Sequence, residues 1–154
     1  MSLETNTNQA HNNILNDAQK IEFRFDHFCF ETDDKQGIIL NYATLPPLMK
    51  NMGCKNVIDK IVAFAALHMQ LRNRKTFVMH LFCKGMKLKD MPTMKTFMIH
   101  FAKVFKVTYP TELQICYVIG APTIFAAIYE LFKSILPKES RDKIVIQELD
   151  SVSN

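Results

Sequence analysis

The sequence predicts a single α/β domain in which helices cover a largely parallel sheet. Short apolar runs typical of strands alternate with helical patterns along most of the 154 residues. The chain is 48% hydrophobic and 22% charged, which suits one globular core and excludes both a disordered chain and a membrane-spanning bundle. The longest uncharged stretch, Leu113 to Tyr129, is interrupted by Gly120-Ala121-Pro122. It therefore predicts a strand followed by a helix, since a membrane span needs about 20 uninterrupted apolar residues.

The first twenty residues are predicted to be a flexible polar tail, and residues 21–154 the folded domain. The tail holds five asparagines and lacks the apolar segment of a secretory signal. The four cysteines (Cys29, Cys54, Cys83 and Cys116) are scattered and form no C-x-x-C pair. Free thiols in a reducing compartment are therefore expected, and with them a cytoplasmic protein.

The first half of the domain predicts two strands and a helix. The strands are expected at Phe23–Phe30 and Ile38–Tyr42, joined by a turn at Asp33–Gly37. Leu45-Pro46-Pro47 is expected to break the second strand, and the apolar run Asn56–Leu71 to form a mostly buried helix.

The second half predicts three strands and two helices. Strands are expected at Lys75–Phe82, Gln114–Ile119 and Lys143–Gln147. A helix is expected from Pro92 to Lys106, with Asp90 as its cap. Its apolar stripe falls at helical spacing: Met94, Phe97, Met98, Phe101, Val104 and Phe105.

The second of these helices, which follows Pro122, carries large apolar side chains on one face: Ile124, Phe125, Ile128, Leu131, Phe132 and Ile135. Burial of six such side chains, at ~1.5–3 kcal/mol each, is worth roughly 10 kcal/mol or more. This face must therefore pack against the sheet, an apolar ligand or a membrane surface. An ordinary core helix would satisfy the same pattern.

Positive charge is concentrated between Leu71 and Lys106. Nine Lys and Arg residues stand there against Asp90, so this segment is +8 and the rest of the +4 chain is −4. Such a field attracts phospholipid headgroups or nucleic acid, although a solvated helix face would carry the same charges. The aromatic residues among the lysines fall on the apolar stripe and are poorly placed for base stacking, which favours membranes.

No motif predicts an enzyme, a cofactor or a metal site. His68, His80 and His100 fall on separate elements without metal-ligand spacing, and structural roles are expected for them. Cys83 and Cys116 have no neighbouring base and are expected to be buried apolar residues. A phosphate-binding glycine loop and a nucleophile elbow are both missing from the sequence.

From Tyr109 onward the sequence resembles the CRAL-TRIO lipid-binding domain, the family of yeast-type phosphatidylinositol transfer, retinaldehyde-binding and tocopherol transfer proteins. The matching stretches are Tyr109-Pro110, CYVIGAP, TIFAAIYELFK, SILP and SRDKIVI, and upstream of them TDDKQGIILNY and FVMHLFCKGMKLKDM. Their order and spacing carry the resemblance, which covers roughly residues 23–147.

The resemblance implies an apolar pocket over the sheet, closed by a gate helix that opens at membranes to exchange one lipid or other hydrophobic ligand. The hinge of the gate would be Gly120, Ala121 and Pro122, because glycine tolerates wide backbone changes and proline suits a helix start. Lys143 matches the family's headgroup lysine. The expected lining is Phe77, Met79, Leu81, Ile115, Tyr117, Ile119, Ile124, Phe125, Ile128, Leu131 and Phe132. Strands buried on both faces need not alternate, so the sequence leaves open which strand face looks inward.

The sequence also departs from the family pattern. Phe82-Cys83-Lys84-Gly85 stands where the family has Asp-Leu-x-Gly, and Thr111 stands where the phosphatidylinositol-transferring branch has Glu. The family's upstream helical domain and its closing C-terminal segment are not present in this sequence. The expected function is binding of one lipid and its transfer or presentation at anionic membranes. A ligand-free module that binds a small GTPase or another protein partner is the alternative.

Overall fold

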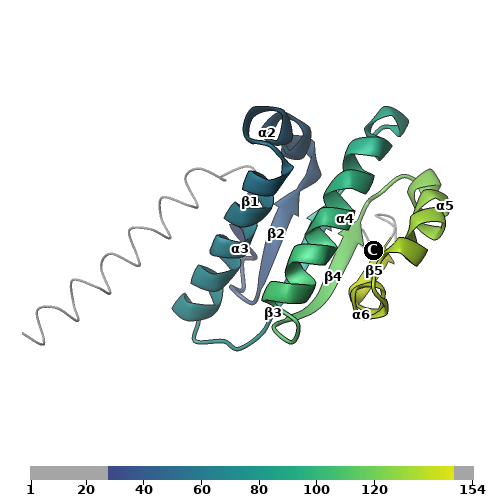
Figure 1. The fold of residues 1–154 in the computed structure, drawn as a ribbon. Helices are drawn as coiled ribbons and strands as arrows, with labels where there is room; N and C mark the ends of the chain where they lie inside the picture. Colours follow the sequence, from purple (N-terminus) through teal and green to yellow (C-terminus); the bar gives the residue numbers. More distant parts are fainter. Residues whose placement is uncertain (1–27, 148–154) are drawn as a thin grey trace, which may run out of the picture.

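The computed structural model describes residues 28–147 (Figure 1), apart from the side chains of Ile124, Ala127, Ile128, Leu131, Phe132 and Ile135. The predicted polar tail and the first part of the predicted strand Phe23–Phe30 lie outside the described residues. So do the last seven residues of the chain.

A five-stranded mixed sheet forms the centre of the domain, and its strands follow one another in sequence order, β1-β2-β3-β4-β5. The short edge strand β1 (Cys29–Glu31) is antiparallel to β2 (Gly37–Asn41). The remaining three, β3 (Phe77–Phe82), β4 (Leu113–Ile119) and β5 (Ile144–Gln147), continue the sheet in parallel. The predicted α/β fold with a largely parallel sheet is confirmed.

The helices connect these parallel strands and cover one face of the sheet. They are α2 (Leu45–Met52), α3 (Cys54–Leu71), α4 (Met91–Thr108), α5 (Thr123–Phe132) and α6 (Lys138–Lys143), with 3-10 turns at Tyr42–Thr44, Leu88–Asp90 and Lys133–Ile135. When parallel strands that follow one another in the sequence are also neighbours in the sheet, right-handed connections all cross the same face of the sheet. Figure 1 shows α3 and α4 side by side in front of the strands, with α5 and α6 beyond α4. None of the helices between residues 28 and 147 combines the length and hydropathy of a membrane span.

Alternate residues of the central strand β3 meet different environments. Phe77, Met79 and Leu81 are fully buried under the helices, whereas the intervening residues of β3, on the other face, are half-buried. The prediction allowed a strand without alternation, as in sheets covered equally on both faces. Alternation occurs because the described helices lie over one face.

Three local features differ from the sequence-based expectation. Pro46 and Pro47 do more than end a strand, because they begin helix α2, where a missing backbone N–H costs nothing. The short charged helix α6 was not predicted. Asp90 occupies the expected position before α4, but its carboxylate accepts a hydrogen bond from the backbone N–H of Lys87 at 3.0 Å instead of capping α4.

A partly buried ionic cluster links β1 to the end of α3. The guanidinium of Arg72 donates two hydrogen bonds to the carboxylate of Glu31, at 2.6 and 2.9 Å, and Nδ1 of His68 lies 2.7 Å from the same carboxylate. Burial alone would raise the pKa of Glu31, but the hydrogen bonds from Arg72 and His68 together hold it below its usual value of 4.5. The cluster therefore stabilises the edge of the sheet as long as Glu31 is ionised.

We predict that Glu31→Gln lowers the free energy of unfolding by about 2 kcal/mol at pH 7, because Arg72 and His68 lose a charged acceptor. Because a depressed pKa contributes stability above the unfolded-state value, the difference should shrink as the pH falls below about 4.5. Urea unfolding at pH 7 and pH 4 measures both effects. The control is Asp59→Asn, which changes an exposed carboxylate on α3, the helix that contains His68. Equal costs for the two variants at pH 7 would contradict the prediction.

Candidate functional site

A cavity of about 230 Å³ lies between α4, α6 and β4, on the helix-covered face of the sheet. Its walls come from the C-terminal half of α4, the Tyr109-Pro110 segment, and the junction between α6 and β5. The lining residues are Phe101, Ala102, Phe105, Lys106, Tyr109, Pro110, Leu113, Cys116, Glu139, Ser140, Lys143 and Ile144. Most of this surface is apolar, and the charged groups come from α6 and the last turns of α4.

Aromatic rings spaced four residues apart build the α4 wall. The rings of Phe101 and Phe105 stack with centroids 4.1 Å apart, and the ring of Tyr109 meets Phe105 at 5.5 Å. The hydroxyl of Tyr109 donates to the carbonyl of Val62 on α3 at 2.8 Å, which fixes the ring and satisfies its polar end. The wall is therefore rigid and apolar, a surface that favours hydrocarbon over water.

Two of the lining residues are lysines that reach solvent. Nζ of Lys143 donates to the carbonyl oxygen of Pro110 at 2.8 Å, and Nζ of Lys106 lies 4.0 Å from a carboxylate oxygen of Glu139. Both partners of the second pair are largely exposed, so their attraction is weak. Neither ammonium group has a strong ionic partner among the described residues. Both are available to an anionic group of a ligand.

The arrangement around Lys143 follows from the chain order. Lys143 ends α6 immediately before β5, and Pro110 lies in the turn before β4, the neighbouring parallel strand. Because parallel neighbouring strands begin at the same end of the sheet, the Tyr-Pro motif before β4 and Lys143 before β5 lie close together. Thr111 follows Pro110, and its backbone N–H donates to the carboxylate of Glu112 at 3.2 Å. The Glu112 carboxylate is thus engaged within its own turn.

The cavity floor contains a thiol whose protonation state is settled by burial. Cys116 on β4 is fully enclosed, and burial raises its pKa to about 12. At neutral pH it is a protonated thiol and contributes an apolar surface to the floor. Among the described residues, no three His, Cys, Asp or Glu side chains lie close enough together to hold a metal ion.

The structure separates the six strand residues expected to line the pocket into two groups. Phe77, Met79 and Leu81 lie under the helices and belong to the packed core. In the register of β3 and β4, Ile115 pairs with Val78 and Tyr117 with His80, so Ile115, Tyr117 and Ile119 lie on the opposite face of the sheet. One cavity cannot be lined by both groups, because alternate residues of a strand point to opposite faces.

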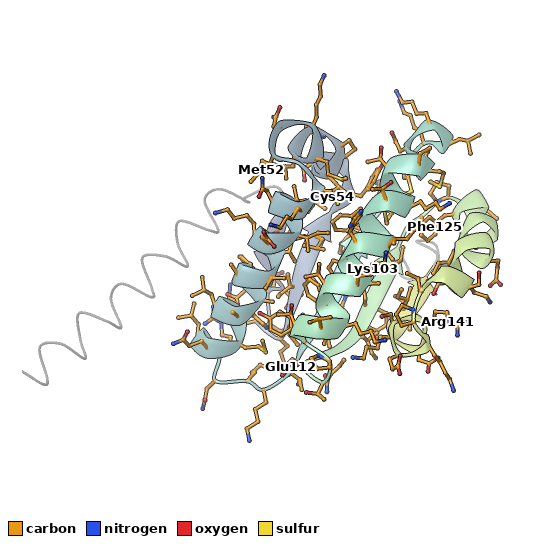
Figure 2. All side chains as sticks on the ribbon, in the orientation of Figure 1. Met52, Cys54, Lys103, Glu112, Phe125 and Arg141 are labelled. Atoms are coloured by element: carbon orange, nitrogen blue, oxygen red, sulfur yellow. The ribbon has the colours of Figure 1, made fainter. Side chains whose placement is uncertain are left out.

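The helix predicted to be the gate corresponds to α5. Phe125 is only 1% exposed and belongs to the core, and its ring lies 6.3 Å from that of Tyr129 one turn later. Figure 2 places Phe125 between α5 and α4. The backbone of Ile124, Ile128, Leu131 and Phe132 is part of α5, but their side chains lie outside the description.

The predicted hinge joins the end of β4 to the start of α5. Gly120 has φ of +73°, a conformation that glycine adopts without strain, and Pro122 directly precedes the first residue of α5. Ala121 between them packs against the core. The backbone N–H of Gly120 donates to the carbonyl of Gln147 at 3.1 Å, so the hinge is attached to the end of β5.

Among the residues that were predicted to bind the ligand and whose side chains the structure describes, Lys143 is the one that lines this cavity. No motif in the sequence assigned Lys106, Glu139 or Ser140 to a site. The pairing of Lys143 with the Tyr-Pro motif, both present in the family pattern, was a signal that could have directed attention to this corner. The tight packing of Phe101 and Phe105 was predicted, but as core and not as a cavity wall.

The family profile of the CRAL/TRIO domain matches residues 29–153. The chain therefore belongs to the CRAL/TRIO domain family, a family of lipid-binding and lipid-transfer proteins. Solved structures that resemble it include the crystal structure of Sfh5, a yeast Sec14-like protein, with a TM-score of 0.52 and 18% sequence identity. That match covers 78% of this chain but 46% of Sfh5, so the chain spans about half the length of this neighbour. No curated protein matches the sequence significantly.

We predict that Ala102→Leu is tolerated because its added carbons enter the cavity. Ala65→Leu is the matched control, a buried alanine on α3 that does not line the cavity. In a filled core such a change costs typically 1–3 kcal/mol, so Ala65→Leu should destabilise by about that amount and Ala102→Leu by less than about 0.5 kcal/mol. Urea unfolding measures both. A similar cost for the two variants would show that the space beside Ala102 is filled.

Proposed function

We propose that this domain binds one lipid molecule, places its hydrocarbon part in the cavity between α4, α6 and β4, and transfers or presents it at membranes. The observation that carries the proposal is the cavity itself, which has an aromatic wall, a buried floor and two lysines that reach solvent. A ligand that is apolar at one end and anionic at the other matches both parts. The family supports the same class of ligand. The protein would work in the cytoplasm and attach peripherally to membranes.

The anionic end of the ligand would lie at Lys143 and Lys106. At present Lys143 donates to a neutral carbonyl, and a phosphate or carboxylate oxygen would give a stronger, charge-assisted hydrogen bond. Thr111 offers no carboxylate at the position where the phosphatidylinositol-transferring branch has Glu. The chemistry of this corner therefore supports recognition of the negative charge of a headgroup, including that of a phosphoinositide, more than recognition of sugar hydroxyls.

Entry of a whole lipid requires movement. Pockets for drug-sized ligands measure about 300–1,000 Å³, and 230 Å³ lies below that range. A diacyl lipid thus needs α5 and α6 to move away from α4. The buried anchor of α5 is Phe125, whose exposure would cost about 1.5–3 kcal/mol in water. A bilayer surface would remove that cost, which makes the membrane the natural place for opening.

The small cavity also favours a second candidate function, a ligand-free module that binds a protein partner such as a small GTPase. Extraction of the purified protein with organic solvent, followed by mass spectrometry, separates the two. Our proposal expects about one lipid per chain after incubation with membranes, and less lipid bound to Ala102→Leu. A protein that stays empty after incubation with mixed vesicles would exclude the lipid carrier and leave the interaction module.

Lys143→Ala should lower the capture of phosphoinositides about tenfold while sparing uncharged ligands such as sterols. The expected loss corresponds to one charge-assisted hydrogen bond, about 1.5–3 kcal/mol when fully formed. Lys138→Ala, an exposed lysine at the other end of α6, is the control and should leave capture unchanged. Binding of fluorescent lipid analogues by titration gives both affinities. Equal affinity of Lys143→Ala and Lys138→Ala for phosphoinositides would remove Lys143 from the site.

Phe125→Asp tests whether α5 is a gate. A carboxylate at this position is costly both in the closed core and in a bilayer, so transfer of fluorescent lipid between vesicles should fall at least tenfold. Thermal unfolding of the same variant is the companion measurement. Loss of transfer with a retained cooperative transition supports a gate. Global unfolding would instead identify α5 as a static part of the core, and a folded variant with normal transfer would place the gate elsewhere.

A further inference from the structure

Five lysines gather at the edge of the sheet where the parallel strands β2, β3 and β4 end. Two chain segments form this edge, residues 42–55 after β2 and residues 83–91 after β3. Their lysines are all exposed: Lys50, Lys55, Lys84, Lys87 and Lys89. The same segments contain one acidic residue, Asp90, whose carboxylate accepts a hydrogen bond from the backbone N–H of Lys87. In Figure 1 the edge runs along the top of the molecule, from α2 to the start of α4.

The second of these segments presents an apolar side chain among its lysines. Leu88 is 62% exposed at the 3-10 turn that precedes α4, with Lys87 and Lys89 on either side. Single exposed leucines are common on protein surfaces. This one is distinguished by its place in a basic turn, between two exposed lysines. An exposed leucine with a lysine on each side suits the boundary between lipid headgroups and acyl chains.

The turn that carries Leu88 is held in place from below. Met86 and Met91 on either side of it are buried in the core. The backbone N–H of Asp90 donates to the carbonyl of Lys87 at 2.9 Å, and that of Met86 to the carbonyl of Cys83 at 3.1 Å. The exposure of Leu88 is therefore imposed by a well-anchored turn.

This turn leaves the sheet next to the hinge of α5. The backbone N–H of Cys83, which follows β3, donates to the carbonyl of Ile119 at 2.8 Å, and Ile119 is the last residue of β4 before Gly120. The basic turn and the hinge thus start from paired positions on adjacent strands. Contact of the turn with a surface would bring that surface to the beginning of α5.

We infer that this edge is the surface by which the protein docks on anionic membranes, with the five lysines against lipid headgroups and Leu88 inserted at the interface. The inference deepens the proposed function and rests on it, because a lipid carrier needs a place where it meets the bilayer. Charge complementarity and the exposed leucine favour a membrane over nucleic acid, since the turn offers no aromatic ring on which a base could stack.

The docking edge differs from the basic segment noted in the sequence. Residues 71–106 contain nine basic residues, but the fold spreads them over the molecule. Arg74 and Lys75 precede β3 at the opposite edge, and Lys103, labelled on α4 in Figure 2, lies along the exposed surface of that helix. Lys50 and Lys55, which lie outside the segment, join the edge instead.

Replacement of Lys84, Lys87 and Lys89 together by Gln tests the charges. Their loss should weaken partition onto phosphatidylserine vesicles on the order of 100-fold at physiological salt, equivalent to about 1 kcal/mol for each lysine. The matched control is the triple change Lys35→Gln, Lys75→Gln and Lys138→Gln, which removes equal charge from exposed positions at the opposite edge. It should change partition by less than about threefold, because those charges lie beyond the Debye length of about 8 Å from the docked bilayer. Equal losses in the two triple variants would overturn the inference.

The insertion of Leu88 has its own readout, because the chain contains no tryptophan. Leu88→Trp places one indole at the 62% exposed position in the basic turn, and Val107→Trp places one at an 82% exposed position near the other end of α4. With phosphatidylserine vesicles, the fluorescence of Leu88→Trp should shift to the blue and be quenched by brominated acyl chains, and that of Val107→Trp should not. The reverse pattern, or binding to nucleic acid without binding to vesicles, would overturn the inference.

These measurements are independent of the lipid cargo. Vesicle binding by this edge in a protein that carries no extractable lipid would retain the docking surface and reject the carrier function. A bound lipid together with vesicle binding that ignores the three lysines and Leu88 would retain the carrier and reject the docking surface.

Discussion

The sequential order of the strands is the constraint on which the other features of this domain depend. Because β2, β3, β4 and β5 are parallel neighbours, each connection must cross over the sheet, and right-handed crossovers place all of them on one face. The core therefore forms between that face and the helices α3 and α4, which are 18 residues each. The last crossover differs because it is divided into α5, a 3-10 turn and the six-residue α6. These short pieces leave space beside α4, and that space is the cavity.

The same constraint puts the two proposed surfaces at opposite ends of the sheet. The lysines of the cavity, Lys106 and Lys143, lie near the starts of β4 and β5. Leu88 and the hinge at Gly120 lie where β3 and β4 end. The divided crossover of α5 and α6 runs from one end to the other.

Much of the fold could be predicted because its signals are local. The apolar stripe of α4, the run without Gly or Pro in α3, and Pro122 before α5 each specify an element without reference to distant residues. The order of the short motifs identified the family, and the family in turn specified the hinge and Lys143. The helix α6 escaped prediction because its sequence, KESRDK, has no apolar periodicity. It is fixed by its place between the turn at Pro137 and the start of β5.

The lining of the cavity could not be predicted from the sequence because it depends on strand register and on packing between distant elements. Tyr117 and Cys116 are equally apolar in pattern, yet the register of β3 and β4 turns Cys116 to the helices and Tyr117 to the other face. Lys106 and Glu139 meet only because α6 packs against α4. The ionic cluster could not be predicted for the same reason, since His68 and Arg72 follow Glu31 in the sequence by 37 and 41 residues. His68, for which the sequence predicted a structural role, contacts Glu31 on the edge strand β1.

The central claim is that the ligand lies on the helix-covered face of the sheet, between α4, α6 and β4. Methyl NMR with a spin-labelled lipid tests it directly, because broadening of a methyl signal reports its distance from the label. Our account predicts strong broadening of Leu113 and Ile144, which line the cavity, and little effect on Ile39 and Val78, which lie on the opposite face. Strong broadening of Ile39 and Val78 with sharp signals from Leu113 and Ile144 would contradict it.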